Sequence, residues 1–272
     1  MSLWSNRGMN VRFDRVVREF GKFGAMALCL VSCTTVPETG RKQLTLFSSA
    51  QEMELGFASF QQMKKEVPLS KDSQLNALMQ RVGRRIAAVA VLPNAQWEFL
   101  VFESKEANAF CLPGGKVGIY TGILPITKDE AGLATVIGHE VAHAVARHGN
   151  ARMSEALVMQ GVGQLLGAAL STSDSRVQAA SMLAYGVGTQ VGRALPHSRL
   201  QESEADHIGL LYMARAGYNP EAAIGFWQRF AEHNRIAGGQ GTPAFLRTHP
   251  LDETRIQQLR GWMSEAKAQY KP

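Results

Sequence analysis

One segment, residues 127–148, constrains the fold of this 272-residue chain most strongly, because it combines a helical start signal with an almost unbroken apolar sequence. Thr127 is of the residue type expected at an N-cap, and Asp129 and Glu130 place negative charge at the positive end of the helix dipole. Gly149 is the expected C-terminal stop. Apolar residues fill most of the first half of the segment: Ala131, Leu133, Ala134, Val136 and Ile137. A helix of this composition is expected to be buried, and its polar side chains then need partners.

Two histidines in the second half of this helix, His139 and His143, are four residues apart. Because four residues is slightly more than one helical turn, both imidazoles project from one face and can hold one zinc ion in tetrahedral geometry. Glu140 lies one position along and can reach a water molecule bound to the metal. The alternative, two histidines on a solvated helix face, is disfavoured by the apolar residues that precede them. The spacing therefore predicts metal-assisted hydrolysis with one Zn(II) per chain.

A catalytic zinc usually takes three protein ligands and leaves one position for water, so a third ligand is required. In the metzincin pattern, a glycine follows the second histidine by three residues and another histidine follows it by six. This chain has Ala146 and Gly149 at those positions, which excludes the metzincin class. The third ligand is therefore expected on a separate helix.

A second helix, expected over residues 198–216, supplies carboxylates at a suitable spacing. Glu202 and Asp206 lie one turn apart and share a stripe with Gly209, whose missing side chain would allow close approach to the first helix. We expect Glu202 to bind the zinc and Asp206 to accept a hydrogen bond from a ligand imidazole, which fixes the tautomer of that imidazole. Glu204, on another side of the helix, remains the alternative ligand.

The remaining segments predict a mainly helical α+β domain with a small sheet beside the active-site helix. A capping box at residues 49–52 predicts one helix, and apolar residues at helical spacing from Leu75 to Ile86 predict another. Residues 96–104 predict a strand, and residues 108–120, interrupted by Pro113-Gly114-Gly115, predict a hairpin.

Residues 153–195 are rich in alanine, glycine and leucine, and almost no charge occurs from Leu157 to Leu170. This stretch is too short and too rich in glycine for a transmembrane helix. We expect a helical element that packs over the active site or rests on a membrane surface. The helix that follows is expected to begin at Ser198, capped together with Gln201, and to end at Gly217.

The N-terminus has the pattern of a secretory leader. A basic stretch that ends at Lys22 is followed by ten uncharged, mostly apolar residues, 23–32, whereas a bilayer span needs roughly 20. Residues 30–33 resemble the bacterial lipobox, in which the signal peptide, here residues 1–32, is removed and Cys33 becomes a lipidated N-terminus. A plain signal peptide and a buried N-terminal helix are the alternatives. Thr34, rather than Asp, follows the cysteine, which favours the periplasmic face of the outer membrane by resemblance to sorted lipoproteins.

The composition of residues 33–43 indicates a tether between the lipid and a single folded domain over residues 44–272. Whether translation starts at Met1 or Met9 stays open. The formal net charge of the chain is +6, half of which lies in the leader, and no cluster of Lys and Arg indicates a nucleic-acid partner. Cys111 would be the one cysteine left after processing, and we expect a half-buried strand residue rather than a nucleophile.

Two motifs of this chain resemble those of a known group of enzymes. The pair of motifs at residues 139–143 and 202–206 is similar to that of the gluzincin peptidases, which include HtpX-like, CAAX-prenyl and Oma-type proteases. Further stretches resemble the branch of BepA-like and LoiP-like periplasmic lipoproteins: the lipobox with residues 39–44, residues 108–115 and residues 248–251. The resemblance implies a zincin-like metalloprotease domain.

Carried over residue by residue, the resemblance makes His139, His143 and Glu202 the zinc ligands, Glu140 the general base and Asp206 the acid behind a ligand. It places the strand with Asn108, Ala109 and Phe110 beside the cleft, where an extended substrate could add as a further strand. It also implies that His249 can approach the zinc, either to stabilise the oxyanion or to occupy the water position as a latch. Three further histidines, His148, His207 and His233, are assigned to helix ends and the surface.

These residues predict a zinc metalloendopeptidase in which zinc polarises a peptide carbonyl and lowers the pKa of its bound water, while Glu140 takes the proton of that water and delivers it to the leaving amine. The resemblance implies unfolded or misfolded envelope proteins as substrates, with outer-membrane assembly machinery as a further partner. The alternative is an assembly factor or chaperone-like protein whose latched zinc site rarely cleaves. A membrane-embedded protease of the HtpX type would need apolar spans that are absent after Cys33.

Overall fold

The helix that carries the two histidines lies at the centre of the fold. In this computed structural model, which describes residues 33–237, 245, 249 and 254–272, that helix is α5 (Glu130–Val145). Every residue from Gly132 to His143 is buried, as its composition predicts. The sheet and the helix α3 (Ser73–Ala87) pack against one part of α5, and α8 (Leu195–Arg215) packs against another. The architecture is therefore mainly helical with small sheets, in agreement with the α+β expectation.

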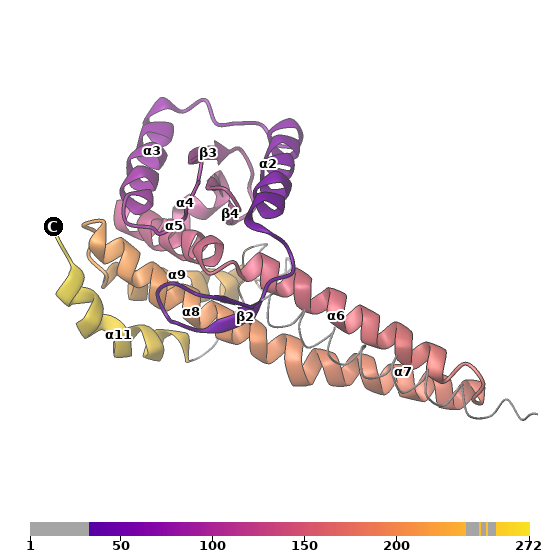
Figure 1. The fold of residues 1–272 in the computed structure, drawn as a ribbon. Helices are drawn as coiled ribbons and strands as arrows, with labels where there is room; N and C mark the ends of the chain where they lie inside the picture. Colours follow the sequence, from indigo (N-terminus) through magenta and orange to yellow (C-terminus); the bar gives the residue numbers. More distant parts are fainter. Residues whose placement is uncertain (1–32, 238–244, 246–248, 250–253) are drawn as a thin grey trace, which may run out of the picture.

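A three-stranded sheet lies above α5, flanked by α2 (Ser49–Glu66) and α3 (Figure 1). Its strand order is β3 (Glu98–Phe102), β5 (Lys116–Tyr120), β4 (Ala109–Leu112), with β5 parallel to β3 and antiparallel to β4. The expected strand and hairpin are thus confirmed. Because β4 is at the edge of this sheet and also packs against α5, one strand edge lies close to the histidines.

Two glycines allow α8 to cross α5 with the backbones in contact. A Cβ atom added to Gly209 on α8 would lie 2.8 Å from the backbone nitrogen of His139, and one added to Gly138 on α5 would lie 2.9 Å from the carbonyl oxygen of Gly209. Separations below 3 Å are too short for a carbon atom, so a side chain at either position would force the helices apart. The close approach expected for Gly209 is confirmed.

The C-terminal part of the chain covers the far side of α8. Two short elements, η1 (Thr121–Ile123) and α4 (Leu124–Thr127), precede α5, and α9 (Ala222–Ala237) and α11 (Arg255–Gln269) follow α8. Three aromatic residues of α9, Phe226, Trp227 and Phe230, are almost completely buried and belong to the same hydrophobic core as the apolar face of α5. As predicted, α8 ends before Gly217, which has a positive φ of 81°.

The predicted helix caps are wrong by one or more residues. Ser48, not Ser49, caps α2, in a reciprocal capping box with Gln51. Asp129, not Thr127, caps α5: Thr127 is the last residue of α4, whereas Asp129 has the extended backbone that an N-cap needs and accepts a hydrogen bond from the backbone N–H of Gly132. Several residues of capping type occur side by side in both places, and the backbone turn decides which one caps.

The predicted stop at Gly149 is also wrong, because α5 ends at Val145 and Gly149 lies inside α6 (His148–Ala169). The break is at Arg147, which adopts a left-handed backbone with φ of 53°. A non-glycine residue in this conformation costs roughly 1–2 kcal/mol. The Arg147 guanidinium offsets that cost, since it pairs with Glu52 (2.7 Å) and donates to the carbonyl oxygen of Phe47 (2.9 Å).

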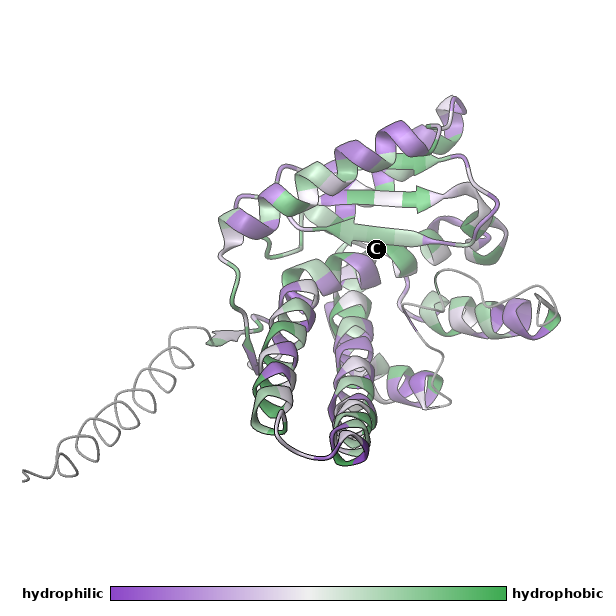
Figure 2. Cartoon of the chain, turned by 90° about the vertical axis from the view of Figure 1, so that its right-hand side faces the viewer, coloured by the Kyte–Doolittle hydropathy of each residue, from purple (hydrophilic) through white to green (hydrophobic). Residues whose placement is uncertain are grey.

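The glycine-rich segment forms a long helical hairpin of α6 and α7 (Ser175–Thr189), which projects from the body of the protein (Figure 1). The expectation that it packs over the active site is wrong. It continues through a five-residue π-helical turn, η2 (Gln190–Ala194), directly into α8, so Ser198 lies inside a helix and is not an N-cap. Hydrophobic residues occur along both helices (Figure 2). Several of their side chains are exposed, among them Leu165 and Leu183. Contact with a membrane surface stays a prediction.

Across the part of the chain that the structure describes, no helix combines the length and apolarity needed to cross a membrane.

Residues 33–43, expected to be a tether, belong to the fold. They form an antiparallel pair, β1 (Cys33–Thr35) and β2 (Lys42–Leu44), in which Val36 is 1% exposed. This short hairpin of residues 33–44 packs against α6 and α8 through buried polar contacts rather than through an apolar run, which explains why its composition suggests a linker. The predicted signal peptide, residues 1–32, lies outside the described residues.

Replacement of Gly209 by alanine tests the backbone contact of α5 and α8. We expect Gly209→Ala to lower the free energy of unfolding by about 1–3 kcal/mol, because the new methyl group overpacks a backbone contact. Urea unfolding of both proteins measures the change. Gly161→Ala is the matched control: Gly161 lies in α6 with open space where its Cβ would be, and alanine there should be neutral or stabilise by up to about 1 kcal/mol. Equal stability of Gly209→Ala and wild type would contradict the contact.

Candidate metal centre

Four side chains from three parts of the chain converge behind β4. His139 and His143 come from α5, Glu202 from α8, and His249 from the segment between α9 and α11; one ligand atom of each lies within 4.8 Å of the others. The Nε2 atoms of the two α5 histidines are 3.1 Å apart, and His249 Nδ1 lies 2.9 Å from a Glu202 oxygen. All four are buried. The structure thus brings together the three residues predicted as ligands and the additional histidine.

This donor set fits one zinc ion. Three imidazoles and a carboxylate are ordinary zinc ligands, and here their nitrogen atoms face one another across a short distance. Glu202 Oε1 is buried and accepts no hydrogen bond from the residues described, although an uncompensated buried carboxylate oxygen is costly. A cation between these groups would satisfy both the oxygen and the imidazole lone pairs.

Glu140 lies at the edge of the same cluster. Its Oε1 is also buried without a hydrogen-bond donor among the described residues, and His249 Nε2 is 3.3 Å away. Burial raises the pKa of Glu140 to about 7, which the charge of His249 partly opposes. A carboxylate with a pKa near neutrality can both accept and return a proton under physiological conditions.

The pKa of Glu202 is shifted in the direction opposite to that of Glu140. Burial by itself would raise its pKa, but the nearby His143 and hydrogen bonds from the surrounding histidines outweigh burial and hold the pKa well below its ordinary value. This favours the carboxylate form of Glu202, which is the form that could bind a metal ion. Two glutamates in one site are in this way suited to different tasks.

Asp206 lies behind His139, as the spacing on α8 predicts. Its Oδ1 is 3.0 Å from His139 Nδ1, so it can accept the proton of that nitrogen and leave Nε2 directed into the cluster. Arg255 from α11 grips Asp206 with two nitrogens, of which Nη2 is 2.7 Å from Oδ1, and its guanidinium stacks 3.4 Å above the Trp227 ring. Sequence reasoning missed Arg255, because a lone arginine 49 residues after its partner carries no local pattern.

The alternative ligand Glu204 does not reach the cluster. It pairs instead with His148, 2.9 Å away, and with Arg41 of the N-terminal hairpin. His148 was expected at a helix end or on the surface; it is the first residue of α6 but is completely buried. His207 is partly exposed and pairs with Glu265, in agreement with a surface assignment.

The predicted substrate strand borders the site. A cavity of about 410 Å³ is lined by β4 residues together with Glu140, His143 and His249. Asn108, Ala109 and Phe110 are among its lining residues, and the outer edge of β4 pairs with no other strand in the described part of the chain. The cavity therefore offers both a strand edge and the polar cluster to an extended chain.

Cys111 also lines this cavity, as a partly buried strand residue. Burial, with a smaller contribution from Glu140, raises the pKa of its thiol far above the ordinary value. The thiol stays neutral and is unsuited to act as a nucleophile.

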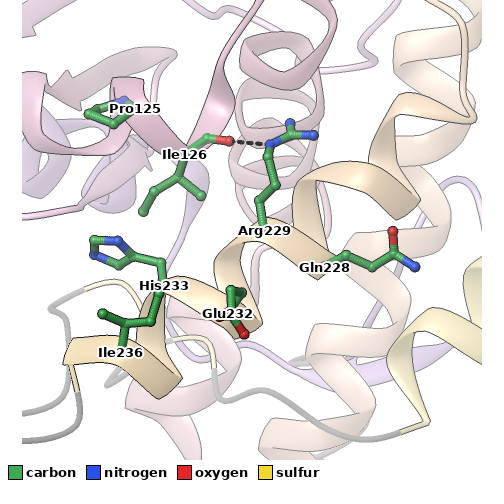
Figure 3. Close-up of a pocket in the computed structure, with 7 residues that line it drawn as sticks. All are labelled: Pro125, Ile126, Gln228, Arg229, Glu232, His233 and Ile236. Atoms are coloured by element: carbon green, nitrogen blue, oxygen red, sulfur yellow. Dashed lines mark hydrogen bonds between the residues drawn. The ribbon is translucent and has the colours of Figure 1, made fainter.

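A second hollow, between α4 and α9, lacks such chemistry (Figure 3). Its cation, Arg229, points at the α4 end and donates to the carbonyl oxygens of Ile126 (2.8 Å) and Thr127 (3.1 Å). His233 and Ile236 lie along its other side. The arginine of this hollow is therefore engaged in holding the end of α4.

Comparison with known proteins agrees with this geometry. The profile of peptidase family M48 matches residues 73–263. The mitochondrial metalloendopeptidase OMA1 of Schizosaccharomyces pombe is 38% identical over 68% of this chain and 52% of the relative. The beta-barrel assembly-enhancing protease of Escherichia coli K12 is 28% identical over 84% of this chain and 47% of the relative, and that of Vibrio cholerae, named as putative, is 30% identical over 87% and 48%.

The chain spans about half the length of the curated relatives that it matches. The expected resemblance to Oma-type and BepA-like proteases is confirmed by these relatives. The matched segment includes both helices that carry the cluster, α5 and α8. The chain belongs to peptidase family M48, a family of zinc-dependent metallopeptidases, and carries a buried histidine and glutamate cluster able to hold one metal ion.

Proposed function

We propose that the protein is a zinc-dependent endopeptidase. The observation that carries this proposal is the burial of three zinc-type ligands and a separate carboxylate, Glu140, beside the edge of β4. A structural zinc site has no need of an additional carboxylate with a pKa near 7, whereas hydrolysis needs a base.

His139, His143 and Glu202 would hold the zinc, and Asp206 would orient His139. Zinc bound there would supply Lewis acidity toward the peptide carbonyl and would lower the pKa of the attacking water. Glu140 would accept the proton of the attacking water and deliver it to the nitrogen of the leaving amine. Direct attack by water requires no covalent enzyme intermediate, which suits a site whose nearby thiol is neutral.

The substrate is proposed to bind in extended form along β4. An edge strand offers backbone N–H and C=O groups that do not depend on the side chains of the substrate, so pairing there is tolerant of sequence. Asn108, Ala109 and Phe110 would align the chain, and the scissile bond would lie over Glu140. Because a folded protein seldom presents a free extended segment, this geometry favours unfolded or misfolded polypeptides.

We further propose that the protein acts in a bacterial envelope, anchored by lipid at Cys33 on the periplasmic face of the outer membrane, where assembly machinery would be a partner. The lipobox-like residues 30–33 and the relatives named beta-barrel assembly-enhancing protease support this location. The exposed position of Cys33 at the start of β1 is compatible with a lipid. Relatives named mitochondrial make the location worth testing directly.

Labelling with a radioactive fatty acid tests the anchor in a bacterial host. We expect wild type to incorporate label and to fractionate with the outer membrane, because one modified cysteine carries the acyl chains. Cys33→Ala should lose the label and leave that fraction, and Cys111→Ala should behave as wild type. Unlabelled wild-type protein would exclude lipidation at Cys33.

Glu140→Gln tests the general base. We expect casein cleavage to fall by roughly 10²–10⁴-fold while bound zinc, measured by mass spectrometry, stays at one per chain, because general acid–base catalysis contributes about that factor and Glu140 is not a ligand. Glu54→Gln, at an exposed position of α2, is the matched control and should cleave normally. Full activity of a zinc-loaded Glu140→Gln protein would sink the proposed mechanism.

One observation favours a second, regulated function. His249 supplies a fourth ligand atom to the cluster, and four protein ligands close a zinc site against water. Its backbone N–H donates to the carbonyl oxygen of Phe245 (2.8 Å), and Phe245 is completely buried against the aromatic residues of α9. In this alternative, the protein assists assembly with a latched site and cleaves rarely.

His249→Ala distinguishes a latch from a catalytic group. If His249 closes the site in nine-tenths of the resting molecules, its removal should raise casein cleavage by about tenfold with zinc retained. Initial rates at equal zinc occupancy measure the effect, and His233→Ala serves as the control. A fall in rate would mean instead that His249 stabilises the oxyanion, and the latched alternative would be abandoned.

A further inference from the structure

The proposed mechanism leaves one buried polar chain unused. It runs from the N-terminal hairpin to the metal cluster and comprises Arg41, Glu204 and His148, all in contact behind His143. His148 is 0% exposed and Glu204 is 7% exposed. Buried charged groups of this kind are expensive unless every member has a partner, so their arrangement calls for a reason.

The contacts form a continuous line. Arg41 donates through Nε (2.9 Å) and Nη2 (2.5 Å) to Oε2 of Glu204, and the same oxygen lies 2.9 Å from His148 Nε2. His148 Nδ1 is 2.8 Å from His143 Nδ1. The opposite ring nitrogen of His143, Nε2, points into the cluster toward His139 and Glu202.

With both imidazoles of this line neutral, proton counting assigns one direction to each hydrogen bond. A carboxylate can only accept, so His148 Nε2 carries a proton and donates it to Glu204. Nδ1 of a neutral His148 is then an acceptor, and the contact of 2.8 Å requires that His143 Nδ1–H donates to it. A neutral imidazole with its proton on Nδ1 has its lone pair on Nε2. The chain thus holds His143 in the tautomer and orientation that a metal ligand needs.

The other α5 histidine is held in the same way from the opposite side. Asp206 accepts a hydrogen bond from His139 Nδ1 and forms an ion pair with Arg255. Each of the two α5 imidazoles is thus backed by a carboxylate–arginine pair. The difference is the imidazole of His148, which is inserted between ligand and carboxylate. It is needed because Glu204 lies on another side of α8 from Glu202 and Asp206 and reaches no metal ligand directly.

The turn after α5 makes this insertion feasible. The left-handed residue Arg147 reverses the chain so that His148 faces back toward His143, five residues earlier. The N-terminal hairpin then closes the arrangement, since Thr39 donates to Oε1 of Glu204 and Gln43 donates to the carbonyl oxygen of Ala146. Residues far apart in sequence therefore meet only in the folded protein.

We propose that His148, Glu204 and Arg41 are positioning residues for the zinc ligand His143, and that the N-terminal hairpin is by this route part of the metal site. The inference rests on the proposed zinc site but adds residues that touch neither metal nor substrate. Outer partners of ligand histidines typically change metal affinity by about 10–100-fold when removed. The same loss is expected here.

Zinc affinity of the full chain, measured by competition with a chromophoric chelator, tests the role of this buried polar chain. We expect His148→Leu to weaken zinc binding by about 10–100-fold, because it removes the acceptor for His143 Nδ1–H. His148→Asn should stay within about threefold of wild type, since its side-chain oxygen can occupy the place of the Nδ1 acceptor. Rescue by asparagine separates a hydrogen-bond role from simple filling of space.

Arg41→Met extends the test to the N-terminal hairpin, at a position that tolerates change because the arginine is partly exposed. It should weaken zinc binding in the same direction, and the visible spectrum of the cobalt-substituted protein should change in both His148→Leu and Arg41→Met. His207→Leu is the matched control: it breaks a histidine–glutamate pair of similar length, 2.8 Å, that touches no ligand, and it should leave affinity and spectrum unchanged.

The outcomes separate this inference from the proposed function. If folded His148→Leu and Arg41→Met proteins keep the zinc affinity and cobalt spectrum of wild type, the positioning role of the buried polar chain is overturned while the zinc site stands. Wild-type protein that binds no zinc would overturn the site itself. If His148→Leu fails to fold, the asparagine and Arg41 variants still decide the question.

Discussion

The contact between the backbones of α5 and α8 is the constraint on which the site depends. A zinc ion accepts ligand atoms only within about 2.0–2.3 Å, so ligands on two helices must be held by a rigid crossing. Gly138 and Gly209 provide it, because neither helix has a side chain where they touch. Gly138 immediately precedes His139, and Gly209 lies two turns after Glu202. The closest approach of the helices therefore coincides with the place where their polar residues meet.

The cluster places several charged side chains in an apolar, buried part of the protein. Its stability therefore depends on the ion-pair partners of those side chains. The two carboxylates behind the α5 histidines each form an ion pair with an arginine: Asp206 with Arg255, and Glu204 with Arg41. Arg255 is itself buried against Trp227, whereas Arg41 is near the surface. The charges of Arg255 and Arg41 oppose protonation of the imidazoles between them, and an uncharged imidazole is the form that binds a metal ion. Breaking a fully buried pair such as Asp206–Arg255 typically costs about 3–5 kcal/mol, so Arg255 contributes to folding as well as to the site.

Two parts of the chain have a character opposite to the one that composition suggests. The polar residues 33–44 are folded into the body, because their side chains complete buried hydrogen bonds. Many apolar side chains of α6 and α7 are exposed on a projecting hairpin, whose hydrophobic residues are coloured green in Figure 2. The first case shows that a segment with few apolar residues can be structural when it satisfies charges that other elements bury. The second leaves an exposed apolar surface directly connected to α8 through η2.

Local sequence determined the features that depend on helical periodicity alone. The spacing of His139 and His143 places them on one face, the interval from Glu202 to Asp206 and Gly209 makes one stripe, and short apolar runs separated by Pro113-Gly114-Gly115 mark the strands. These relations hold within one element, so they need no knowledge of the rest of the fold. Local sequence did not determine where the helices start. Neighbouring residues such as Thr127 and Asp129 are both of capping type, and the preceding turn decides which one caps.

Only the tertiary structure decided which distant residues support the ligands. Arg255, His148 and Arg41 lie on three different elements, and each meets its partner across a gap of 49 or more residues. No periodicity links such positions, since the contact arises from how the helices cross and where the chain reverses at Arg147. The sequence by itself thus determined the ligand type and spacing of the metal centre. The packing of α8, α11 and the N-terminal hairpin decided how those ligands are held, because hydrogen-bond partners of buried charges are chosen by proximity in space.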